Sequence, residues 1–178
     1  MQNLTRIARL SDVLYRGTSV LLPLLPLLVL GYGLWGLRDP GWLNGAFPEL
    51  PTATRLTAAK SVGVLAIGAL ALGPICAALW QMRGLFARYR RGEILTAACA
   101  GHIRRSGVAL VVLAGMQVLI RPLQILALTA DNPPGEKMLA ISLSGEMLWL
   151  ALAGGLLVVI GWVMAEAALA AEENAGFV

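Results

Sequence analysis

Residues 81–96 read Gln81-Met-Arg-Gly-Leu-Phe-Ala-Arg-Tyr-Arg-Arg-Gly-Glu-Ile-Leu-Thr96, and residues 102–105 read His102-Ile-Arg-Arg105. Two long apolar runs precede this region and two follow it. Six of the 14 lysines and arginines of the chain lie here: Arg83, Arg88, Arg90, Arg91, Arg104 and Arg105. Arginines concentrated between apolar runs are typical of a cytoplasmic loop of a membrane protein. Residues 81–105 therefore predict a basic cytoplasmic hinge between two pairs of spans.

The composition supports a membrane protein. Of the 178 residues, 58% are hydrophobic and only 13% are charged, and the mean hydropathy is +0.75. A soluble globule of this size needs more polar side chains to cover its surface. The net charge of +4 does not indicate nucleic-acid binding, because the basic residues lie beside apolar runs instead of on one polar surface.

Four apolar runs are long enough to cross a bilayer, and each predicts a helix. They cover about residues 18–37, 61–80, 106–128 and 146–165. We therefore predict an all-α fold, an integral membrane four-helix bundle that forms a single domain over residues 1–178. Outer loops are expected at 38–60 and 129–145, and the hinge covers 81–105. Within the hinge, apolar residues from Met82 to Tyr89 share one helical face, which predicts an amphipathic helix folded down on the membrane.

The distribution of positive charge predicts the orientation. Nine lysines and arginines lie in the N-terminal segment and the hinge, whereas four lie in the outer loops: Arg38, Arg55, Lys60 and Lys137. The positive-inside rule then places both termini in the cytoplasm. We expect the bacterial inner membrane as the location, with anionic lipid headgroups against the basic hinge.

Several local features refine this outline. Residues 1–17 have helical spacing and predict an interfacial helix on the cytoplasmic surface, with a frayed terminus as the alternative. Pro23 and Pro26 predict a kink in the first span. Gly92 is expected to end one helix and Thr96 to cap the next. The outer loop 38–60 carries aromatic residues that suggest anchors along the membrane surface, with a substrate-binding loop as the alternative.

The third predicted span contains three polar side chains on one face, Gln117, Arg121 and Gln124. Polar groups inside a membrane are costly, so they are expected to face protein or water. We expect Arg121 to pair with Glu146 at the outer end of the fourth span. This arrangement would make a structural clasp between the third and fourth spans, or alternatively an ion or proton pathway.

Small residues predict where helices approach closely, because they let backbones come together. The predicted packing positions are Gly63, Ala69, Gly73, Ala77, Gly154 and Gly155. On the cytoplasmic side, the arginines of the hinge and two acids of the C-terminal tail form a candidate interaction surface. Its members are Arg83, Arg88, Arg90, Arg91, Arg104, Arg105, Glu172 and Glu173, and we expect the two acids to contact arginines of the hinge.

The chain resembles a bacterial family of integral membrane proteins, the domain-of-unknown-function family numbered 2975. The resemblance lies in Leu85-Phe-x-x-Tyr-x-x-Gly-Glu-Ile-Leu-Thr96, Ile103-Arg-Arg-x-Gly107, Asn132-Pro-Pro-Gly135 with Ile141-Ser-Leu-Ser144, and the closing Glu166 to Val178 segment. It covers about the last 100 residues. Leu95 replaces the Phe that is usual at its position in the family. The resemblance implies four spans and brings no assigned reaction.

The sequence lacks the familiar motifs of metal, nucleotide and nucleophile chemistry. The one histidine, His102, lies among arginines, where contact with headgroups is expected in preference to catalysis. We therefore predict no enzyme activity, no metal and no cofactor. The expected function is binding to another membrane protein or to a second copy, as an accessory or assembly subunit of a larger complex or as a membrane regulator. The alternative is a small channel or transporter that uses the polar stripe of the third span.

Overall fold

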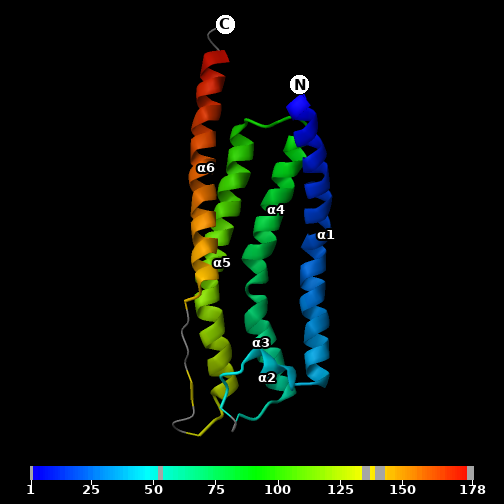
Figure 1. Ribbon diagram of the computed structural model, residues 1–178, viewed down its shortest axis with the longest axis vertical. Coiled ribbons are helices and arrows are strands. Elements are labelled where there is room, and N and C mark those ends of the chain that lie inside the picture. The colour runs from blue at the N-terminus through cyan, green and yellow to red at the C-terminus, as the bar shows by residue number, and fades with distance from the viewer. Residues whose placement is uncertain (1, 52–53, 134–136, 139–142, 176–178) are drawn as a thin grey trace.

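The computed structural model describes residues 2–51, 54–133, 137–138 and 143–175. Every regular element in these ranges is a helix, which confirms the all-α prediction. Figure 1 shows the helices running side by side along the long axis of the molecule, with the N- and C-termini at the same end. We call this end the terminal end and the opposite one the loop end.

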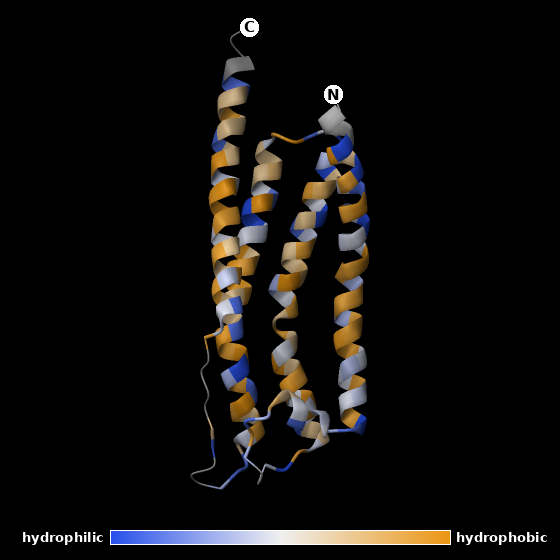
Figure 2. Ribbon diagram, in the orientation of Figure 1, coloured by the Kyte–Doolittle hydropathy of each residue, from blue (hydrophilic) through white to orange (hydrophobic). Residues whose placement is uncertain are grey.

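Four helical segments are long and apolar enough to cross a membrane, as predicted. The first is α1 (Gln2–Arg38), and the second consists of α3 (Ala58–Ala69) followed by α4 (Leu72–Tyr89). The third is α5 (Ala97–Thr129) and the fourth is α6 (Gly145–Ala175). A short helix, α2 (Trp42–Ala46), lies in the loop after α1. Figure 2 shows apolar residues along the middle of the long helices and polar residues toward both ends.

The long helices pack in a row. α1 packs against α3 and α4, these two pack against α5, and α5 packs extensively against α6. No comparably extensive contact joins α1 to α6 within the described ranges. The row is therefore open along α1 and along α6, and each of these helices has a broad surface that no other described helix covers.

Two helices are longer than the hydropathy predicts. The expected interfacial helix at 1–17 is wrong, because α1 runs without interruption from Gln2 to Arg38 and includes Pro23 and Pro26. The expected amphipathic hinge helix is also wrong, because its residues belong to α4, which continues along α1 to Tyr89. Arginines at the end of α4 contact α1, and these contacts keep α4 alongside α1. The predicted ends of the hinge are confirmed: Gly92 has φ +81° and Thr96 caps α5.

The second span is divided at Leu70 and Ala71, between α3 and α4. Pro74 has no N–H to donate to the carbonyl of Leu70, four residues earlier. The N–H of Gly73 donates to that carbonyl instead, at 3.3 Å. This hydrogen bond spans three residues instead of the four of an α-helix, which interrupts the helix. The span therefore has two helical segments where hydropathy predicts one.

At the loop end, the connection after α1 enters the helix row instead of lying on the membrane surface. Leu43 of α2 and Phe47 just after it are buried, and they form a core with Val64, Ile125 and Leu128. Burial of these side chains fixes α2 against α3 and α5. The aromatic-anchor prediction is thus replaced by a plug that closes this end of the row.

The fourth helix is displaced along its axis relative to α5. Gly154 faces Gly107, and Gly161 faces the backbone of Arg104. In this antiparallel register Glu146 lies level with about Leu119. The first turn of α6 therefore lies about 15 Å short of the end of α5 at the loop end. At the terminal end, α6 extends beyond α5 (Figure 1).

Candidate functional site

The polar stripe of α5 faces the plug at the loop end. The amide of Gln124 donates to the carbonyl of Val64 in α3 at 3.0 Å. Arg121 lies between Gln117 and Gln124 and reaches the plug. Gln117 is half-buried and makes no hydrogen bond with a described residue. Two of the three side chains thus connect α5 to its neighbours, and Gln117 lies deeper in the membrane without such a bond.

Arg121 makes three contacts with the plug. Its guanidinium donates to the carbonyl of Ala46, the last residue of α2, at 3.1 Å, and to Oε1 of Glu49 at 2.6 Å. The guanidinium also lies 4.2 Å from the centre of the Phe47 ring. A cation at the C-terminal end of a helix and over an aromatic face is favourable on both counts. Arg121 therefore fixes the plug to α5.

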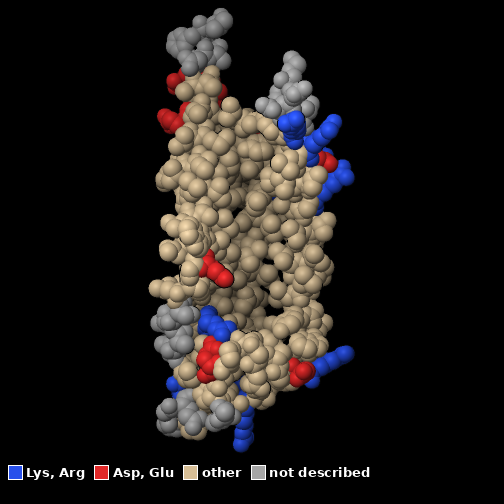
Figure 3. Space-filling view, viewed as in Figure 1, with Lys and Arg blue, Asp and Glu red and all other residues tan. Residues whose placement is uncertain are grey.

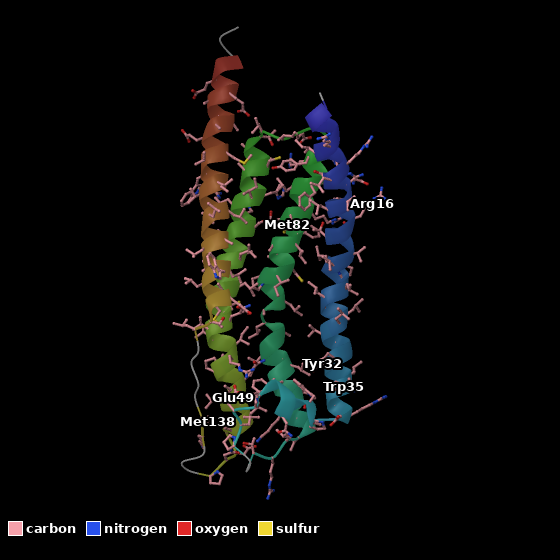
Figure 4. All side chains as sticks on the ribbon, viewed as in Figure 1. Arg16, Tyr32, Trp35, Glu49, Met82 and Met138 are labelled. Carbon is pink, nitrogen blue, oxygen red and sulfur yellow. The ribbon has the colours of Figure 1, made fainter. Side chains whose placement is uncertain are left out.

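The predicted pairing of Arg121 with Glu146 is wrong. The guanidinium of Arg121 forms an ion pair with Glu49 instead. Figure 4 shows Glu49 at the loop end, beside α5. Glu146 is exposed and makes no ion pair with a described residue. The clasp thus joins α5 to α2 and its following loop, not α5 to α6. The signal for Glu49 was its place between Pro48 and Pro51, two residues after the aromatic residue Phe47, but hydropathy treats this segment as a loop.

Lys60 forms a second connection at the loop end, which its place in a predicted outer loop does not indicate. Its ammonium donates to the carbonyl of Leu128 at 2.7 Å, and it lies 3.6 Å from a carboxylate oxygen of Asp131. The side chain of Lys60 is only 10% exposed. Because the last carbonyls of a helix lack intrahelical donors, this lysine satisfies the end of α5.

At the terminal end, two of the predicted surface arginines contact α1. Arg83 donates to Oγ of Ser19 at 2.9 Å and to the hydroxyl of Tyr15 at 3.1 Å. Arg90 forms an ion pair with Asp12 at 2.9 Å. Both guanidinium groups lie over the ring of Tyr15, at 5.2 Å and 4.7 Å from its centre. Tyr15 is therefore the point at which the basic end of α4 is attached to α1.

The predicted contacts between the acidic tail and the hinge arginines are absent among the described residues. Arg88 pairs with Glu93 of its own connection at 2.8 Å. Glu172 and Glu173 are exposed on the part of α6 that extends beyond α5 (Figure 1), and neither makes an ion pair with a described residue. At this end, Figure 3 shows acidic side chains on the side of α6, and basic side chains with one acidic group among them on the side of α1. No ion pair among the described residues therefore joins the tail to the hinge.

The other arginines of the predicted surface have exposed side chains without a partner among the described residues. Arg91, Arg104 and Arg105 are exposed and make no hydrogen bond or ion pair with a described residue. Three cations therefore remain available at the terminal end.

The closest helix approach lies between α5 and α6. A Cβ atom on Gly154 would lie 2.8 Å from the carbonyl oxygen of Gly107, and one on Gly161 would lie 2.8 Å from the backbone of Arg104. Gly154 is thus a packing position, as predicted. The predictions for Gly63, Gly73 and Gly155 are wrong, because a Cβ atom there meets nothing within 4 Å. Ala77 is exposed and Ala69 is half-buried.

The described residues include no group of three or more histidine, cysteine or acidic side chains that could bind a metal. His102 lies against Gly84, and its Nδ1 is 2.8 Å from Oε1 of Gln81. This contact joins α4 to α5 near the terminal end.

A groove of about 540 Å³ lies beside the first turns of α6. Its lining is mostly apolar and includes Val111, Ala114 and Val118 of α5 together with Leu148 of α6. Glu146 lies in the same first turns of α6. An exposed carboxylate and an apolar groove thus occur in the same turns of α6, although the Glu146 side chain does not itself line the groove.

Comparison with known proteins gives one match. The family described as "Protein of unknown function (DUF2975)" matches residues 38–176. No curated protein and no solved structure matches the chain.

Proposed function

Because the chain belongs to the DUF2975 family, which has no described activity, we propose its function from the exposed groups of its spans. The proposed function is non-enzymatic: the protein binds another membrane protein inside the bilayer, as an accessory or assembly subunit or as a membrane regulator. The proposed location is the bacterial inner membrane, with both termini in the cytoplasm. The arginines at the terminal end support this orientation.

Glu146 is the observation that carries the proposal. It is exposed, it makes no ion pair with a described residue, and it lies level with about Leu119 of α5. The nearest end of α5 is about 15 Å away along the helix axis, so the carboxylate lies within the apolar part of the spans. A carboxylate in hydrocarbon is costly unless a donor satisfies it. A donor from another helix would remove this cost.

The groove beside α6 provides the surface for such a helix. It is mostly apolar and adjoins the turn that carries Glu146, whose side chain lies outside the lining. Among the described residues α6 packs extensively only against α5, so its other side is open to a partner there. The proposed occupant is one transmembrane helix of another protein that carries a lysine or arginine at the depth of Glu146. The charge of the carboxylate favours this occupant over an entirely apolar helix.

The polar stripe supports a transport function less well. Arg121 and Gln124 are bonded to the plug and to α3, and these bonds would have to break for an ion or proton to use them. The same bonds are what a structural clasp requires. The stripe therefore favours the role of clasp over that of pathway.

Purification in a mild detergent from native membranes, followed by mass spectrometry, tests the proposal. We expect a stoichiometric membrane protein with the wild-type chain and its loss with Glu146→Leu. Glu172→Leu is the matched control, because it removes an exposed acid of the same helix at the terminal end, far from Glu146. A wild-type chain without a partner, or a partner retained by Glu146→Leu, would contradict the proposal.

A further inference from the structure

A second groove lies between α4 and α5, on the terminal half of the row. Its volume is about 340 Å³. The side chains that line it are apolar or small except at one end, where two polar groups lie. The lining includes Gly73, Ala77 and Gln81 of α4 and Arg105, Val108 and Val112 of α5.

Small residues of α4 form the floor of this groove. Gly73 and Ala77 are exposed, and a Cβ atom on Gly73 would meet nothing within 4 Å. These residues therefore do not bring two helices together, although their spacing predicts that they do. Instead, they leave room beside α5 for a narrow apolar ligand.

The groove has a direction with respect to the membrane. Gln81 is bonded to His102, one turn from Arg105, so both polar groups lie at the terminal end of the groove. Gly73 lies eight residues from Gln81, which corresponds to about 12 Å along α4. The groove therefore runs from the basic end of the spans into their apolar part, as an acyl chain does.

The polar end presents unused donors. Arg105 is exposed and makes no bond with a described residue. The carboxamide oxygen of Gln81 is 2.8 Å from Nδ1 of His102, which leaves the amide N–H groups of Gln81 for another acceptor. A guanidinium and an amide at the same level can donate together to a phosphate.

We propose that this groove binds one phospholipid with an anionic headgroup. One acyl chain lies over Gly73 and Ala77, and the phosphate accepts hydrogen bonds from Arg105 and Gln81. The uncompensated charge of Arg105 favours an anionic headgroup over a zwitterionic one. The apolar length of the groove favours a lipid over free phosphate. This site is independent of the surface around Glu146.

Native mass spectrometry of the detergent-solubilised chain, with phosphatidylglycerol and phosphatidylcholine of identical acyl chains, tests the site. We expect one phosphatidylglycerol to be retained at least fivefold more than phosphatidylcholine. Arg105→Gln should bring the two lipids to near-equal retention. Ala77→Leu fills the groove and should lower retention of both lipids about tenfold, and Gly73→Leu should do the same. Arg91→Gln is the matched control, an exposed arginine outside the groove, and should change neither.

Three results would overturn the proposal. One is equal retention of both lipids by the wild-type chain. Another is a loss of selectivity with Arg91→Gln as large as that with Arg105→Gln, which indicates diffuse attraction to the basic end. The third is undiminished retention in both groove-filling variants. The thermal unfolding midpoint of each variant confirms that it is folded, and a folded chain with any of these results excludes the site.

Discussion

The guanidinium of Arg121 lies 2.6 Å from a carboxylate oxygen of Glu49, although the two residues are separated by 72 positions in the sequence. Arg121 also donates to the end of α2. One arginine of the third span thus holds the plug that closes the loop end. This bond gives the cation of the third span a structural contact.

The Arg121–Glu49 pair predicts a specific coupling in stability. Arg121→Leu should lower the free energy of unfolding by about 2 kcal/mol, because it leaves Glu49 and the carbonyl of Ala46 without their donor. The double variant with Glu49→Leu should cost clearly less than the sum of the single variants. Unfolding by sodium dodecyl sulfate in mixed micelles measures both. Coupling of Arg121 to Glu146 instead of Glu49 would refute the arrangement.

The contacts of Lys60 predict that the two partners of its ion pair with Asp131 contribute unequally to stability. Lys60→Met should destabilise the chain by about 1–2 kcal/mol, because the carbonyl of Leu128 loses its donor in a buried position. Asp131→Asn should cost under about 0.5 kcal/mol, because the side chain of Asp131 is 82% exposed. Thermal unfolding of the two variants in the same detergent compares them. Equal losses would mean that the ion pair, and not the carbonyl bond, stabilises this end.

The α5–α6 contact predicts which glycines are replaceable. Gly154→Ala and Gly107→Ala should each destabilise the chain by about 1–3 kcal/mol, because the added methyl group meets the backbone of the other helix. Gly155→Ala and Gly63→Ala are matched controls with open space around the added atom, and should be neutral or slightly stabilising. Resistance to unfolding in mixed micelles ranks the four variants. A control as damaging as Gly154→Ala would contradict the register of the two helices.

The contacts of Tyr15 predict that its ring contributes more than its hydroxyl to the attachment of α4 at the terminal end. Tyr15→Leu should expose the connection between α4 and α5 to protease several-fold, because Arg83 and Arg90 lose the ring between them. Tyr15→Phe keeps the ring and loses only the hydroxyl that Arg83 contacts, so its effect should be smaller. Limited proteolysis of reconstituted protein measures both. Equal effects of the two variants would assign the attachment to the hydroxyl.

Deletion of residues 171–178 should leave that protease sensitivity unchanged. Glu172 and Glu173 make no ion pair with a described residue, and Arg88 and Arg90 pair with Glu93 and Asp12. The same proteolysis assay, applied to the shortened chain, tests this. Greater cleavage after the deletion would show that the tail protects the connection.

Hydropathy predicted the four spans because the cost of placing polar groups in a bilayer is a property of short segments. The caps of the hinge were also predictable, since Gly92 and Thr96 act on adjacent backbone groups. The ends of the helices were not predictable in the same way. Hydropathy detects where the apolar part of a span ends, whereas α1 and α4 continue as helices beyond it.

Partners distant in sequence were the least predictable. Arg121 and Glu146 are at nearly the same depth, and this made their pairing reasonable from span boundaries alone. Glu49 becomes the partner only because Leu43 and Phe47 draw the loop into the row. The available signal was an acid within an apolar, aromatic loop, but tertiary packing decided the outcome.

The central claim is that another helix docks beside Glu146, and photo-crosslinking in native membranes tests it most directly. A benzophenone amino acid is introduced at Leu148, which lines the groove, or at Leu30 of α1. The two leucines have similar exposure, 61% for Leu148 and 64% for Leu30. We predict one discrete adduct from position 148, none from position 30, and loss of the adduct when Glu146→Leu is added but not when Glu172→Leu is added. No adduct from position 148, or an adduct indifferent to Glu146, would contradict the claim.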